Sequence, residues 1–163
     1  MLSLINNFSI SRCYKPISDG FSDPVYVSLH GFSDASTIGY SAVVYIRQVS
    51  KNGQVVLTYV IICKSCVAPK VKGQISAATI PKLELNAAAL LVKLMDKVRQ
   101  SMNMVIHDVF YWCDSQAVLS CILSVSKRFP VYWSNRLALI HGLSSVQEWR
   151  YVPTKCNPAD IGS

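Results

Sequence analysis

The spacing of apolar residues changes at Pro81, and this change constrains the fold more than any other feature of the sequence. Before Pro81, the runs 25–33, 40–48 and 54–64 have the apolar and β-branched character of half-buried strands. The pair Asn52-Gly53 predicts a hairpin turn between the last two of these runs. After Pro81, leucines and valines recur at helical spacing until Ser101, and a proline in the first turn is typical of a helix start. The chain is therefore expected to form an antiparallel meander followed by a long helix.

The remaining sequence alternates between the two patterns. Strands are predicted at 105–112 and 146–152, helices at 115–123 and 132–143, and a last helix begins at Asn157-Pro158 and is truncated one turn later. The order βββ-α-β-α-α-β-α indicates a mixed α/β fold with a five-stranded sheet flanked by helices. We expect residues 1–24 to be an irregular lead-in and residues 25–163 to be one domain, because 163 residues suit a single domain.

Composition narrows the class of partner. Hydrophobic residues make up 51% of the chain and charged residues 15%, which excludes disorder for most of it. The net charge of +7 suits a polyanion such as a nucleic acid. No run approaches the roughly 18 apolar residues of a membrane span, and the first dozen residues lack the apolar run of a signal peptide. We therefore expect no membrane partner and a cytoplasmic location.

The cysteines offer one alternative chemistry. Cys63 and Cys66 have the spacing of a zinc ligand pair, but a structural zinc site needs a second pair at similar spacing. No such pair follows, and His107 and His141 stand alone. Without a secretion signal, disulfides are not expected either. The cysteines are better interpreted as small buried hydrophobic residues.

Four of the nine acidic residues lie at the ends of predicted elements. Asp34 and Asp114 end the first and fourth strands, Glu84 lies in the first turn of the long helix, and Asp160 opens the last helix. If the first and fourth strands are neighbours, the four carboxylates can converge at one sheet edge. Oxygen ligands without histidine or cysteine favour Mg²⁺ or Mn²⁺, and two such ions can hydrolyse a phosphodiester. Taken singly, such an acid is more often a helix cap or a partner of the helix dipole, and either Asp114 or Ser115 could be the N-cap of the helix predicted at 115–123. Taken together, the four acids favour a shared site.

Six short stretches around these acids are informative as an ordered set. They are Leu29-His-Gly-Phe-Ser-Asp-Ala-Ser36, Ala42-Val-Val-Tyr45, Ile80-Pro-Lys-Leu-Glu-Leu85, Asp114-Ser115, Trp149-Arg-Tyr-Val-Pro153 and Asn157-Pro-Ala-Asp160. In these stretches the sequence resembles the ribonuclease H domain of the Pol polyprotein of BEL/Pao-type retrotransposons.

The resemblance implies a ribonuclease H fold and an activity. Asp34, Glu84, Asp114 and Asp160 would be the catalytic residues and would bind two Mg²⁺ ions, with Mn²⁺ as a substitute. The reaction would be endonucleolytic cleavage of the RNA strand of an RNA–DNA hybrid during reverse transcription. Partners would be the hybrid and the reverse transcriptase and integrase domains of Pol, in the cytoplasm, in a virus-like particle or in the nucleus. Residues expected to contact nucleic acid are Ser36, Lys82, Ser115 and Gln116, with Lys64, Lys70 and Lys72 as phosphate ligands or merely a solvated basic loop.

Two alternatives remain open. The loop 151–156 lacks the histidine that many ribonucleases H carry before the last Asp, and the final helix is cut short. A degenerate, non-catalytic module that binds hybrid or connects parts of Pol is therefore the second interpretation. An integrase is the third, since 33 residues separate Asp114 from Glu148, but Glu148 precedes an apparent strand rather than lying on a helix.

Overall fold

A mixed five-stranded sheet forms the centre of the molecule. A computed structural model describes residues 26–51, 53, 55–69, 79–124 and 127–163. The strands are β1 (Tyr26–Ala35), β2 (Gly39–Val49), β3 (Val55–Val67), β4 (Asp108–Cys113) and β5 (Trp149–Tyr151). Their spatial order is β3-β2-β1-β4-β5. The first three strands pair antiparallel, whereas β4 pairs parallel with β1 and β5 parallel with β4. Gly53, with φ of 75°, closes the predicted turn between β2 and β3.

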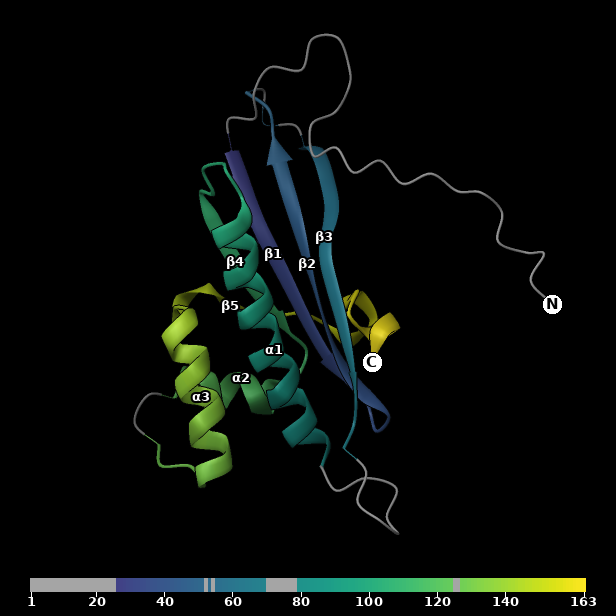
Figure 1. Cartoon of the computed structure of the whole chain (residues 1–163), viewed down its shortest axis with the longest axis vertical. Coiled ribbons are helices and arrows are strands. Elements are labelled where there is room, and N and C mark those ends of the chain that lie inside the picture. Colours follow the sequence, from purple (N-terminus) through teal and green to yellow (C-terminus); the bar gives the residue numbers. More distant parts are fainter. Residues whose placement is uncertain (1–25, 52, 54, 70–78, 125–126) are drawn as a thin grey trace, which may run out of the picture.

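Three helices cover one face of this sheet (Figure 1). They are α1 (Ile80–Ser101), α2 (Gln116–Leu123) and α3 (Val131–Leu143). Helix α1 packs on β1 and β2, and α3 packs on α1. The sequence predicts this arrangement because α1 presents leucines at helical spacing to the inward-facing residues of the strands. None of the helices in the described ranges is long and apolar enough to cross a membrane.

Gly31 sets the close approach of α1 to the sheet. A Cβ atom at this position would lie 2.6 Å from Leu91 Cδ1 and 2.7 Å from Met95 Cε. Both side chains are fully buried. The absence of a side chain at Gly31 therefore lets α1 lie directly on β1, the strand that ends at Asp34.

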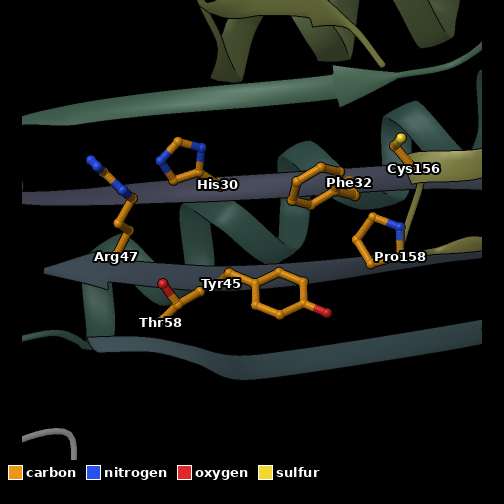
Figure 2. A pocket seen from close by; sticks show the side chains of 7 residues that line it. All are labelled: His30, Phe32, Tyr45, Arg47, Thr58, Cys156 and Pro158. Carbon is orange, nitrogen blue, oxygen red and sulfur yellow. The ribbon is translucent and has the colours of Figure 1, made fainter. Parts of the chain in front are cut away.

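The opposite face of the sheet carries aromatic side chains. The rings of Phe32 and Trp112 stack at 5.9 Å, and the ring of His30 stacks on Phe110 at 5.0 Å. A cavity of about 270 Å³ lies on this face, and Figure 2 shows the side chains that line it. Its lining residues are His30, Phe32, Tyr45, Arg47, Thr58, Cys156 and Pro158. The C-terminal residues thus lie on the side of the sheet that the three helices leave open.

Several predicted boundaries were wrong. The fifth strand was expected at 146–152, but Val146–Glu148 forms a 3₁₀ turn, η1, and the strand is limited to Trp149–Tyr151. The cause is a capping box, in which the backbone N–H of Ser145 donates to Glu148 Oε2 at 2.7 Å. The last element is not an α-helix but two 3₁₀ turns, η2 (Thr154–Cys156) and η3 (Asp160–Gly162).

Smaller shifts affect three further elements. Strand β4 begins at Asp108 rather than at 105, and β3 extends to Val67 rather than to 64. Because α1 already begins at Ile80, Glu84 is its fifth residue and lies beyond the first turn. The predicted lead-in at 1–24, and with it the domain boundary at residue 25, lies outside the described residues.

Candidate metal and nucleic-acid site

The parallel pairing of β1 with β4 brings two of the predicted acids together. Ser33 is opposite Cys113 in this ladder, so Asp34 and Asp114 follow adjacent positions at the same end of the sheet. The condition stated from the sequence, that the first and fourth strands be neighbours, is therefore met. Asp34 is buried, with 7% of its surface exposed, and Asp114 is half-buried.

The C-terminal segment closes over Asp34. Asn157 Nδ2 donates to the backbone oxygen of Ser33 at 3.0 Å and lies 3.4 Å from Asp34 Oδ1. The hydroxyl of Ser163 donates to Asp34 Oδ2. Ser41 on β2 donates to the backbone oxygen of Ala159 at 2.6 Å, which fastens the segment to the sheet. Asp34 is thus held by residues more than 120 positions later in the chain.

Several carboxylates lie near Asp34 and affect its pKa. Burial raises the pKa of Asp34 to about 6, although the hydrogen bond from Ser163 lowers it. The neighbouring carboxylates of Asp114 and Asp160 add to the rise. Two of the other predicted acids therefore lie close enough to Asp34 to act on it electrostatically. Asp160 does so from an exposed position in η3.

Glu84 joins the same region through Ser115. The hydroxyl of Ser115 donates to Glu84 Oε2 at 2.6 Å and accepts from the backbone N–H of Val118 at 3.3 Å. Burial raises the pKa of Cys113 to about 12, and the charges of Asp114 and Glu84 contribute to the rise. The structure also identifies Ser115, not Asp114, as the N-cap of α2. The carboxylate of Asp114 is consequently not occupied by capping.

The donor set fits a hard divalent cation in its chemistry. All four side chains supply carboxylate oxygens, the ligands that Mg²⁺ prefers. Burial is the main cause of the raised pKa of Asp34, and the charges of Asp114 and Asp160 add to it; a cation bound there would favour the ionised carboxylate. Within the described ranges, however, no three histidine, cysteine or acidic side chains are grouped closely enough to hold a metal. The four acids lie in one region without forming a closed coordination shell.

The residues predicted to contact nucleic acid have different surroundings. The hydroxyl of Ser36 accepts from the backbone N–H groups of Ile38 at 3.1 Å and Gly39 at 3.4 Å, so it stabilises the turn between β1 and β2. Gln116 is exposed at the start of α2. Lys82 lies over the ring of Tyr132, 5.5 Å from its centroid. Lys64 is exposed on β3, whereas Lys70 and Lys72 lie outside the described residues.

The zinc interpretation receives no structural support. Cys63 and Cys66 both lie on β3, and residues three apart on a strand point to opposite faces. The five described cysteines are free. Glu148, the acid of the integrase interpretation, belongs to the capping box of η1.

Asn157 and Ser163 were not predicted as partners of Asp34. The stretch Asn157-Pro-Ala-Asp160 drew attention only through its acid. The available signal was an asparagine directly before a proline, since asparagine side chains often form hydrogen bonds with nearby backbone groups in turns. The side chain of Asn157 does accept from the backbone N–H of Ala159 at 3.2 Å. Its contact with β1 depends on tertiary structure and gives no signal in the sequence.

Solved structures of other proteins are similar to this chain. The N-terminal RNase H domain of a Mycobacterium tuberculosis protein, solved as a fusion with maltose binding protein, is 14% identical, with a TM-score of 0.50 over 85% of this chain and 91% of that one. RNase H1 from the archaeon Halobacterium salinarum is 16% identical, with a TM-score of 0.47 over 84% and 93%. LC11-RNase H1 in complex with an RNA/DNA hybrid is 13% identical, with a TM-score of 0.49 over 83% and 92%. At 14% identity the likeness to the Mycobacterium tuberculosis domain shows the fold alone.

The sequence itself shows the family. No curated protein matches the chain. Residues 2–115 match the model of the Pao retrotransposon-like RNaseH-like domain. This match covers more than half of the chain and includes three of the four acids, Asp34, Glu84 and Asp114. The chain therefore belongs to the family of Pao retrotransposon-like RNaseH-like domains.

Proposed function

We propose that this domain is a metal-dependent endoribonuclease that cleaves the RNA strand of RNA–DNA hybrids during reverse transcription of a retroelement. The observation that carries the proposal is the junction of β1 and β4, where Asp34 and Asp114 meet and Asp160 adds its charge. Family membership and the net charge of +7 support the same function.

Each residue has a defined part in this proposal. Asp34 and Asp114 would bind both Mg²⁺ ions, with Glu84 on one side and Asp160 on the other; Mn²⁺ would substitute. The ions supply the activation of a water molecule and the stabilisation of the leaving oxygen of the phosphodiester. Asn157 and Ser163 hold the carboxylate of Asp34 in place. Ser115 orients Glu84 through its hydroxyl.

The substrate, the partner domains and the cellular location are part of the same proposal. The hybrid would be the substrate, and the reverse transcriptase and integrase domains of Pol would be partners within one polyprotein. Such a domain would act in the cytoplasm, inside a virus-like particle or in the nucleus, wherever reverse transcription occurs. Ser36, Lys82, Ser115 and Gln116 would contact the hybrid.

A second candidate is a degenerate module that binds hybrid, or connects parts of Pol, without cleaving. The exposed position of Asp160 on a single 3₁₀ turn favours it. So does the lack, among the described residues, of three metal-ligating side chains grouped closely enough to hold an ion.

Cleavage of a labelled hybrid separates the two candidates. The 163-residue chain is incubated with an RNA–DNA hybrid, with duplex DNA and with duplex RNA, each in Mg²⁺ and in EDTA. We expect Mg²⁺-dependent nicks in the RNA strand of the hybrid only, with 3′-hydroxyl and 5′-phosphate ends. Asp96→Asn is a matched control, because Asp96 lies on α1 and accepts a bond from Gln100. A folded chain that binds hybrid and leaves it intact would identify the degenerate module instead.

A further inference from the structure

A second cavity, which has a mainly polar lining, lies on the helical side of the sheet, between α1, α3 and the start of β2. It has a volume of about 310 Å³. Its polar lining residues are Tyr40, Asn86, Lys93, Asn135 and Arg136. Among the described residues that line it, none is acidic. A cavity with two cations and no carboxylate in its wall is suited to an anion.

Arg136 is held in one orientation. Its guanidinium lies over the ring of Tyr132, 4.2 Å from the centroid, and its Nε donates to Asn86 Oδ1 at 3.2 Å. The hydroxyl of Tyr132 donates to the same oxygen at 2.9 Å. Within the described part of the chain the outer nitrogens of the guanidinium have no hydrogen-bond partner, so they can bind a ligand, and an ordered guanidinium loses little entropy when it does so. Because Asn86 accepts both bonds through Oδ1, its amide N–H groups face away from them as further donors.

The cations continue along α1 as a stripe. Lys82, Asn86 and Lys93 are separated by four and seven residues, which places them on one side of the helix. Lys82 lies over the ring of Tyr132, so this stripe and the cavity share one surface, which we call the α1–α3 seam. Lys82 and Lys93 are about 16 Å apart along the helix axis. That length matches about five nucleotides of one strand at ~3.4 Å each.

The seam lies beside the four acids and uses none of them; Lys82 is the one residue that it shares with the proposed hybrid contacts. Glu84, between Lys82 and Asn86 in sequence, turns to a different side of α1 and contacts Ser115. Asp96, the acid one turn after Lys93, accepts a bond from Gln100. Neither carboxylate lines the cavity.

We propose that the α1–α3 seam binds the phosphate groups of a polynucleotide strand, with Arg136 and Lys93 as ligands in the cavity and Lys82 continuing the path toward Glu84. The inference rests on the proposed function for its ligand class, since a hybrid bound at the carboxylates must extend its strands beyond them. The seam would anchor the strand by charge and would take no part in cleavage.

Binding in the absence of metal tests the seam separately from cleavage. The affinity of the 163-residue chain for a labelled RNA–DNA hybrid is measured in EDTA over a range of salt concentrations. Lys93 is exposed, so Lys93→Ala leaves the core intact. We expect this variant to bind about two- to fivefold more weakly and to lower the slope of log K against log salt by about 0.9. Lys93→Glu should weaken binding further.

The control is Lys51→Ala, an exposed lysine in the turn between β2 and β3, which removes the same charge elsewhere. Equal effects of Lys93→Ala and Lys51→Ala would overturn the inference. Inorganic phosphate, titrated at constant ionic strength, distinguishes the source of the anion. If it stabilises the protein in a Lys93-dependent way while hybrid affinity does not depend on Lys93, the cavity binds free phosphate and the inference fails. Lys93-dependent binding without cleavage would contradict only the proposed function.

Discussion

Asp34 is a carboxyl group that its surroundings keep partly uncharged. It is buried at the end of β1, where burial and the charges of Asp114 and Asp160 raise its pKa to about 6. A buried carboxylate beside other carboxylates destabilises the protein that holds it. Such a group is therefore retained at a cost in folding stability, and that cost can be measured.

The first prediction concerns the pH dependence of that cost in the metal-free protein. Well below pH ~4, the pKa of an ordinary Asp, Asp34 is protonated in both the folded and the unfolded chain. As the pH rises from ~4 through 6 the unfolded chain loses this proton before the folded chain does, so the stability that protonated Asp34 contributes is lost over this range. Asp34→Asn should therefore exceed the parent in free energy of unfolding by about 1–2 kcal/mol at pH 7.5, and by much less at pH 4. Urea unfolding in EDTA measures this difference, and a difference that does not change with pH would contradict it.

The second prediction separates catalysis from binding. Because Ser115 caps α2, Asp114 can be changed without loss of the helix N-cap. Asp114→Asn should abolish Mg²⁺-dependent hydrolysis and leave hybrid affinity within about twofold, since cations supply that affinity. Rates of hybrid cleavage and affinity in EDTA are compared with those of the parent. Near-parental cleavage would show that Asp114 is not part of the metal site.

Residue-level roles could be predicted only in part. Asp34 and Asp114 were identified because few acids occur in apolar stretches, and the structure places both at adjoining strand ends. The choice between Asp114 and Ser115 as cap could not be made, because both residue types accept a bond from a helix N–H. Asn157 and Ser163 were missed since their partner is remote in sequence.

At the level of elements, the contact of α1 with β1 determines where the carboxylates lie. Glu84 is carried by α1 and Asp34 by β1, and Gly31 sets the spacing between the two elements. The core residues Leu91 and Met95 pack directly above that glycine.

The third prediction tests this spacing. Gly31→Ala places a methyl group within 2.7 Å of Leu91 and Met95, so buried side chains must move. We expect a loss of about 1–3 kcal/mol in the free energy of unfolding. Gly142→Ala is the matched control, because a Cβ there meets no atom within 4 Å and alanine favours the helix α3. Thermal unfolding of both variants should show destabilisation by the first and none by the second; equal melting temperatures would contradict the role of Gly31.

Elements whose apolar residues recur at a regular spacing were predicted best. The hairpin strands and α1 follow from apolar spacing, whereas the fifth strand was too long by four residues because Ser145 and Glu148 form a capping box. The Ser-x-x-Glu spacing was present in the sequence, but next to strand-forming residues it was outweighed by them. The last helix was also wrong, because propensity alone cannot distinguish one turn of α-helix from 3₁₀ turns.

At the scale of the whole molecule, the order of the elements nearly determines the sheet. A meander followed by alternating helices and strands left few arrangements, and the observed order β3-β2-β1-β4-β5 is one of them. The adjacency of β1 and β4 had to be assumed from the sequence, since parallel partners are joined by a long crossover that carries no register signal. The fold was thus predictable from the sequence. The convergence of the four acids could be predicted only on the assumption that β1 and β4 are neighbours.

The fourth prediction is a response of the whole fold to Mg²⁺. If the carboxylates bind the ion, Mg²⁺ at 100 times its dissociation constant should stabilise the folded chain by about 2.7 kcal/mol, a rise of about 5–10 °C in melting temperature. Sodium chloride at equal ionic strength is the control for screening, and Asp34→Asn should lose most of the response. A parent chain that melts at the same temperature with and without Mg²⁺ would favour the degenerate module.

The contacts of Asn157 and Ser163 with Asp34 join positions 123 and 129 residues apart. On the ribosome, β1 emerges early, and the residues that secure its terminal carboxyl are translated long afterward. Throughout elongation the nascent polypeptide therefore holds Asp34 without those partners and without Asp160. If the four acids form a nuclease site, that site is assembled only when residues 157–163 have left the exit tunnel, so a partly synthesised chain lacks the complete site and cannot cleave a hybrid.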